Sequence, residues 1–351
     1  MTDNDKKPET ASETTGAATP PPDAAQPQAE AGGEMRLKFF PVSFFAVVMG
    51  LSGLTLAWRK LAEHAGTTGL FSHLLGLLTL AVFILLAVAY VMKFARYPQA
   101  VKQELNHPVM SAFFPAISIS LLLLAACFLP LSRALAVVLW GAGTALHLIL
   151  TLHIVRSWIH KEHFEIHHLN PAWFIPAVGN VIVPLAGVPL GQAELSWFFF
   201  AVGISFWVIL LVIVFNRVLF HDPLPPMLLP TLFILIAPPA VGFLSYLKLT
   251  GGEVDAFARV LYYLALFFTL LLVIELPRFA RLPFFLSWWA YSFPSAAVTT
   301  ATFVMAEKLH SGFLGGLAMV LVVALTVLIA YLSFMTLKAV RAKKICVERK
   351  H

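Results

Sequence analysis

Ten long apolar stretches dominate this sequence and constrain its fold more than any other feature. Each is roughly 17 to 28 residues long, the length that an α-helix needs to cross the hydrocarbon core of a bilayer. The connections between them are short and carry most of the charged residues. The sequence therefore predicts an all-α membrane protein with ten transmembrane helices. The predicted spans lie near residues 39–61, 71–95, 109–129, 131–158, 172–190, 194–218, 226–248, 254–277, 282–305 and 312–338.

Composition supports this class. The chain is 59% hydrophobic and only 12% charged, which is too little polar surface to cover a water-soluble globule. Residues 1–34 differ from the rest, because they are rich in Ala, Thr, Glu, Gln and Pro and have almost no aliphatic bulk. We predict a disordered cytoplasmic tail at 1–34, a ten-helix membrane domain at 35–340 and a basic cytoplasmic tail at 341–351.

Lysine and arginine gather on one side of this predicted topology. The N-terminus, the connection after each even-numbered stretch and the C-terminus hold most of them. The positive-inside rule then places both termini in the cytoplasm, which an even number of spans allows. We expect a multi-pass protein of a bacterial inner (plasma) membrane. Because this topology accounts for the net charge of +6, we expect no nucleic-acid partner.

Prolines alternate along the ten stretches. They lie inside the third, fifth, seventh and ninth stretches and are absent from the interiors of the even-numbered ones. Backbone that a proline breaks is stable only against protein or water, because lipid cannot satisfy the freed carbonyls. The alternation predicts five helical hairpins, with the odd helices around a central pore and the even helices outside. The competing interpretation is that the prolines only kink packed helices. The expected pore-shaping residues are Pro115, Pro176, Pro184, Pro238, Pro239 and Pro294.

Ionisable side chains are almost absent at mid-depth in the predicted spans. His147 and His153 lie in the fourth stretch, and Glu275 lies near one end of the eighth. A proton-coupled pump usually needs buried carboxylates, which are missing here. Broken helices in a neutral pore present backbone N–H groups and partial positive charge to the passage. We therefore expect a small anion as the solute.

Three motifs resemble one membrane-protein family. The run "WWAYSFP", Trp288 to Pro294, resembles the matching helix of the plant guard-cell slow anion channels. The run "NPAWFIPAVGN", Asn170 to Asn180, and the run "GEVDAFARVLYY", Gly252 to Tyr263, resemble regions of the bacterial tellurite-resistance protein TehA. Together with ten spans, they identify residues 39–338 as similar to the tellurite-resistance/dicarboxylate transporter family.

That resemblance implies a homotrimer in which each subunit has its own pore and a phenylalanine plugs it. The position that matches the plugging residue is Phe293. Pro294 disfavours helical geometry at Phe293, so its ring can turn toward the axis and form a hydrophobic constriction that gates by dewetting. Other aromatic residues of the odd stretches are candidates to narrow the same passage: Phe113, Phe114, Phe174, Phe233 and Phe243.

A cytoplasmic histidine cluster supports a different class of function. On one helix, His160, His163 and His167 would share a face with spacing that suits zinc, which makes a membrane metalloenzyme an alternative. One segment seldom supplies a closed set of metal ligands, so we expect no metal, no cofactor and no enzymatic activity.

The sequence leaves the transport mechanism open. An uncharged, kinked lining serves a channel for chloride, nitrate, sulfite or C4-dicarboxylates as well as a proton-coupled carrier for C4-dicarboxylates or sulfite. Both activities occur in the resembled family, as does a link to tellurite resistance. The preferred expectation is passage of small anions through a pore that Phe293 gates.

Overall fold

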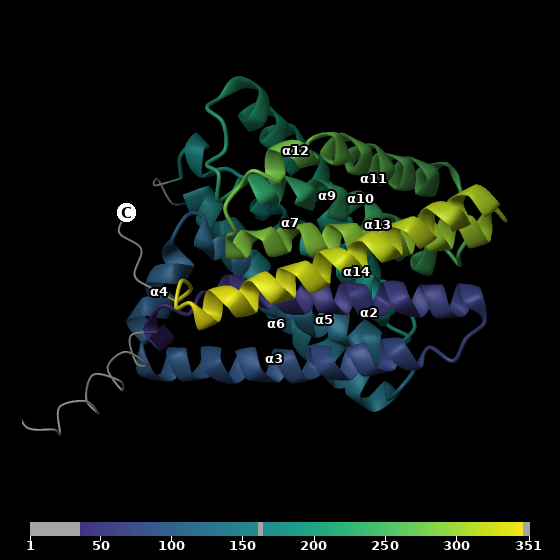
Figure 1. Cartoon of the computed structure of the whole chain (residues 1–351), viewed down its shortest axis with the longest axis horizontal. Helices are drawn as coiled ribbons and strands as arrows, with labels where there is room; N and C mark the ends of the chain where they lie inside the picture. Colours follow the sequence, from purple (N-terminus) through teal and green to yellow (C-terminus); the bar gives the residue numbers. More distant parts are fainter. Residues whose placement is uncertain (1–35, 161–163, 347–351) are drawn as a thin grey trace, which may run out of the picture.

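The computed structural model describes residues 36–160 and 164–346, and these residues form helices and no strands. The long helices run side by side along the long axis of the molecule, with α3 at one edge and α11 at the other (Figure 1). Eight helices in the described part are long and apolar enough to cross a membrane. The predicted all-α membrane fold is confirmed. The predicted tail at 1–34 and the end of the basic tail lie outside the described residues.

The helices fall into an inner and an outer set. The outer helices are α3 (Leu70–Arg96), α6 (Arg133–His160), α9 (Ala193–Phe220), α11 (Ala256–Ile274) and α14 (Gly312–Arg341). The inner segments join a 3₁₀ stretch to an α-helix: η1–α2 (Val42–Phe44, Phe45–Ala65), η2–α5 (Met110–Phe113, Ala116–Phe128), η6–α10 (Leu229–Ile236, Ala237–Leu249) and η7–α13 (Leu286–Tyr291, Ser292–Lys308). The remaining inner segment has four short pieces: η4 (Pro171–Trp173), α7 (Phe174–Val178), η5 (Gly179–Ile182) and α8 (Val183–Gly187).

The predicted count of ten spans goes beyond these eight helices. The fifth predicted stretch forms a shorter apolar helical segment at Pro171–Gly187, and α13 in the ninth has 17 residues after η7. Neither is among the eight candidates, so a ten-span topology stays a prediction. A short helix, α4 (Pro98–Asn106), follows α3 at one end of the molecule (Figure 1).

Burial separates the two sets. In the most apolar part of each span, 61%, 89% and 72% of the residues are buried in the inner spans that begin at Val42, Met110 and Leu229. The outer helices reach only 22% to 39%. The inner segments also contact one another in a closed ring, because α2 packs on α5, α5 on α8 and η5, these on α10, α10 on α13, and α13 on α2. Each inner segment packs against the outer helix that follows it in sequence.

The prolines occupy helix starts rather than helix interiors, which differs from the expected broken interiors. Pro115 is the N-cap of α5, and every other candidate is the second or third residue of an α-helix. Proline fits the first turn, where its missing N–H is not needed. The 3₁₀ geometry before that turn is what interrupts the α-helix. Apart from η5, which lies between α7 and α8, these 3₁₀ stretches begin their segments and so lie toward the end of the molecule that carries α4.

A buried ion pair fixes the chain at the α4 end. Lys93 Nζ lies 2.6 Å from Glu104 Oε2, with 4% and 10% of the two side chains exposed. Glu104 also accepts hydrogen bonds from the Val42 N–H (2.7 Å) and the Tyr90 hydroxyl (3.0 Å), and Lys93 donates to the Phe40 carbonyl (2.8 Å). This network joins α3 and α4 to the start of the first inner segment.

We predict that Glu104→Leu destabilises the protein more than Lys93→Met does. Loss of Glu104 leaves a buried ammonium and two donors without their acceptor, and breaking such a pair costs about 3–5 kcal/mol. Loss of Lys93 leaves a carboxylate that two donors still hold. The melting temperatures of the purified variants in one detergent test the order, and equal melting temperatures would contradict it.

Candidate pore constriction

A small cavity lies where the five inner segments meet. Its volume is about 40 Å³, enough for about one water molecule. The residues that line it come from all five inner segments and, within the described part of the chain, from no outer helix. They are Met49, Ile119, Phe174, Ile175, Val178, Gly179, Val181, Ile182, Ile234, Ala237, Pro238, Val241 and Phe293. Every lining side chain is apolar, so water meets no polar group on the lining side chains themselves.

Phe293 lies in the first turn of α13, directly before Pro294, and its ring contributes to the cavity wall. Only 8% of the residue is exposed. The same wall includes residues of α7, η5 and α10, among them Phe174, Gly179 and Val241. Phe293 thus shares the wall of this small cavity with residues of the other four inner segments.

Two glycines of α2 position α13 and therefore Phe293. A Cβ atom added at Gly53 would lie 2.6 Å from the Cβ of Ala296 and 3.5 Å from the Phe293 ring. Gly50 is similarly close to Ser292 and Trp289. Real Cβ atoms do not approach as closely as 2.6 Å, so these glycines allow the side chains of α13 to pack directly on the backbone of α2.

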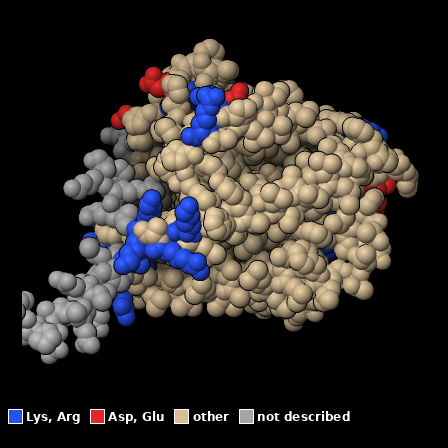
Figure 2. Space-filling view, viewed as in Figure 1, with Lys and Arg blue, Asp and Glu red and all other residues tan. Residues whose placement is uncertain are grey.

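Charge lies at the ends of the molecule and not in the cavity. Figure 2 shows lysine and arginine gathered where α14 ends and near α12 (Leu276–Phe279), with few at the opposite end of this face. Exposed Lys338, Arg341, Lys343 and Lys344 contribute to this basic end. This unequal distribution of positive charge attracts anions to the basic end of the molecule, and dissolved salt screens the attraction beyond about 10 Å.

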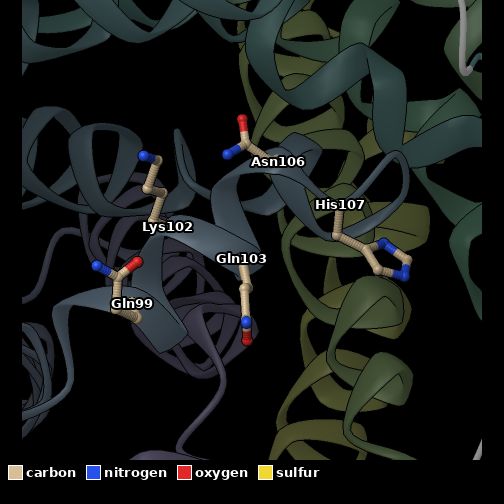
Figure 3. A pocket seen from close by; sticks show the side chains of 5 residues that line it. All are labelled: Gln99, Lys102, Gln103, Asn106 and His107. Atoms are coloured by element: carbon tan, nitrogen blue, oxygen red, sulfur yellow. The ribbon is translucent and has the colours of Figure 1, made fainter.

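A larger surface hollow of about 390 Å³ lies on α4 and the residue after it. Figure 3 shows its five polar side chains, Gln99, Lys102, Gln103, Asn106 and His107, which point in different directions rather than toward one centre. Its lining includes no residue of an inner segment, so it is not part of the constriction.

Comparison with known proteins agrees with this arrangement. Residues 39–337 match the family described as SLAC1, voltage-dependent anion channel. The chain belongs to the SLAC1 family. The S-type anion channel SLAH2 of Arabidopsis thaliana is 30% identical over 310 residues, which cover 83% of this chain and 59% of SLAH2. SLAH3 from the same plant is 31% identical and covers 78% of this chain and 44% of SLAH3. The chain thus spans about half the length of these two plant relatives.

A bacterial relative matches over nearly its full length. The tellurite resistance protein TehA homolog of Haemophilus influenzae is 28% identical over 302 residues, which cover 85% of this chain and 90% of that protein. The resemblance that the sequence motifs indicated is therefore confirmed at the level of the SLAC1 family.

The structure brings some of the predicted site residues of this SLAC1-family chain together and leaves others apart. Phe293, Pro238 and Phe174 line one cavity. The other five candidate prolines lie at helix starts outside the lining, and Phe113, Phe114, Phe233 and Phe243 are buried elsewhere in the core. Most lining positions were not among the predicted residues, because an Ile or Val at the centre has the same sequence pattern as one packed against a neighbouring helix.

The histidine cluster does not form the helix face that a metal site would need. Helix α6 is described up to His160, and Phe164 and Glu165, past the gap in the description, are not helical. His163 lies outside the described residues. His167 Nδ1 lies 3.1 Å from Glu165 Oε2, and no three metal-ligating side chains gather in the part of the chain that is described.

We predict that Gly53→Ala destabilises the protein by about 1–3 kcal/mol, the usual cost of overpacking. The added methyl group must push α13 away, which also displaces Phe293. Gly316→Ala in α14 is the matched control, since a Cβ there meets no atom within 4 Å. Thermal unfolding of both variants tests this, and equal melting temperatures would show that α2 and α13 can accommodate the added methyl group without loss of stability.

Proposed function

We propose that this chain passes small anions across the membrane in which it lies and that Phe293 closes the path. The observation that carries the proposal is the dry cavity at which all five inner segments converge, with Phe293 in its wall. Family membership supports the same reading, because relatives of this family carry the name of anion channels. Chloride, nitrate, sulfite and C4-dicarboxylates are the solute classes that the sequence favours.

The charge distribution supports an anion over a cation. A cation pathway needs carboxylates or inward carbonyl rings to replace lost hydration, and among the described residues no acidic side chain lines the cavity. The basic end raises the local anion concentration. Weak, neutral contacts in the constriction then favour release after entry.

The first test is electrical. Phe293→Ala in planar bilayers should carry anion currents at least ~tenfold above wild type, which corresponds to a barrier lower by ~1.4 kcal/mol. Phe303→Ala is the matched control, since Phe303 lies in the same helix, is 1% exposed and does not line the cavity.

Two results would contradict the gated channel. Equal currents in the two variants would show that any core truncation opens a leak. Silent bilayers together with uptake of radiolabelled malate or sulfite by proteoliposomes would favour the slow carrier instead.

We also propose that both termini lie on the cytoplasmic side of the inner membrane and that the chain assembles as a homotrimer. The basic end, which includes the end of α14, supports the orientation. The family resemblance supports the assembly.

Labelling of the two thiols tests the orientation. Cys127 is buried, whereas Cys346 is partly exposed beyond α14. A membrane-impermeant maleimide should label Cys346 in inside-out vesicles and not in intact spheroplasts. Burial raises the pKa of the Cys346 thiol, although nearby Arg36 and Lys93 lower it in part. Since a raised pKa leaves less thiolate at neutral pH, labelling should accelerate as the pH rises past the ordinary thiol range. Labelling of Cys346 in spheroplasts but not in inside-out vesicles would show that the C-terminus lies on the outer side of the membrane.

A further inference from the structure

A buried histidine stands directly behind the cavity wall. His147 lies in the outer helix α6 and is 0% exposed. The ring edge that carries Cε1 and Nε2 faces Gly179: a Cβ added there would lie 2.7 Å from Cε1 and 2.9 Å from Nε2. Gly179 itself lines the cavity. Because Gly179 has no side chain, the imidazole nitrogen approaches within one residue of the path.

Hydrogen bonds on the other side of the ring assign its tautomer. Ser118 Oγ lies 2.8 Å from the Pro115 carbonyl oxygen and 2.9 Å from His147 Nδ1. A hydroxyl has one proton to donate. Both contacts become hydrogen bonds only when Nδ1–H donates to Ser118 and Ser118 donates to Pro115. This arrangement leaves Nε2 without a proton, as an acceptor.

That acceptor has no donor among the described residues. Asn180, the next residue after Gly179, likewise has a buried Oδ1 without a partner in the described chain, since its amide Nδ2 donates to the Ala177 carbonyl at 2.7 Å. A buried acceptor without a donor is costly, and native structures hold few of them. A solute in the cavity that carries an O–H or N–H group could donate the missing hydrogen bond.

We propose that His147 Nε2 accepts a hydrogen bond from permeating anions that carry an O–H group, and so favours protonated oxyanions over anions without a proton. The inference rests on the proposed function and names a residue that discriminates within it. Bicarbonate and nitrate are the matched probes, because both are planar, singly charged and of similar size, and only bicarbonate has an O–H. Ser118 acts as a positioning residue that fixes the tautomer.

The experiment measures reversal potentials under bi-ionic conditions, with bicarbonate on one side and nitrate on the other, for proteins that also carry Phe293→Ala. His147→Leu should lower the bicarbonate-to-nitrate permeability ratio roughly fivefold, the size of one neutral hydrogen bond. His147→Gln, which offers an amide oxygen, should restore part of the ratio. His153→Leu is the control, since His153 lies in the same helix and is exposed.

Each outcome bears on one claim. If the Phe293→Ala parent passes no anion, the proposed function fails. If the parent conducts and His147→Leu leaves the ratio unchanged, the role of His147 is wrong. If His147→Leu is not recovered folded, the Ser118→Ala variant is measured instead. Without the Ser118 hydroxyl, the His147 ring can adopt the other tautomer, with a proton on Nε2, so the bicarbonate-to-nitrate permeability ratio should fall. An unchanged ratio overturns the inference.

Discussion

Backbone hydrogen bonding in a medium without water governs this architecture. A lipid-facing segment must satisfy its own N–H and C=O groups, and a continuous α-helix does so. The inner segments depart from that geometry where a 3₁₀ stretch meets an α-helix, as between Ile236 and Ala237. They are stable because α3, α6, α9, α11 and α14 separate most of their surface from lipid, as the contrast in burial shows. Irregular backbone and its enclosure by the outer helices are thus two results of one constraint.

Packing at the centre depends on glycines, whose missing side chains allow neighbouring groups to approach closely. Gly50 and Gly53 bring α2 against α13, and Gly179 makes room for the imidazole of His147. Such close approach leaves a cavity for about one water molecule, bounded by rings and branched aliphatic groups. The centre is therefore small and apolar, and no ion pair of the described residues lies in the cavity lining.

The arrangement of the helices could be predicted well from the sequence, whereas the residues that line the central cavity could be predicted only in part. Length and apolar content predict the helices, and the alternation of prolines correctly separates inner from outer segments. Phe293 was predicted as the gate because it precedes Pro294 in a run that resembles a family motif, and the structure places it in the cavity wall. The position of the prolines at helix starts was missed, since proline in a sequence marks an interruption without saying on which side the α-helix lies. No sequence signal distinguishes the lining residues Met49, Ile119 and Val241 from other core residues. A hydrophobic pattern shows that a residue is buried but does not show which residues it packs against.

The 3₁₀ stretches at one end of the inner ring also set its length. A 3₁₀ helix rises about 2.0 Å per residue, whereas an α-helix rises about 1.5 Å. Rewinding the eight residues of η6 as α-helix would shorten that segment by about 4 Å and turn its side chains about the helix axis. Pro238 and Pro239 oppose this change, because they would then lie inside a continuous α-helix without N–H groups for the carbonyls of Ile234 and Leu235. The two prolines thus hold this inner segment at its longer 3₁₀ length, whereas the outer helices are continuous α-helices.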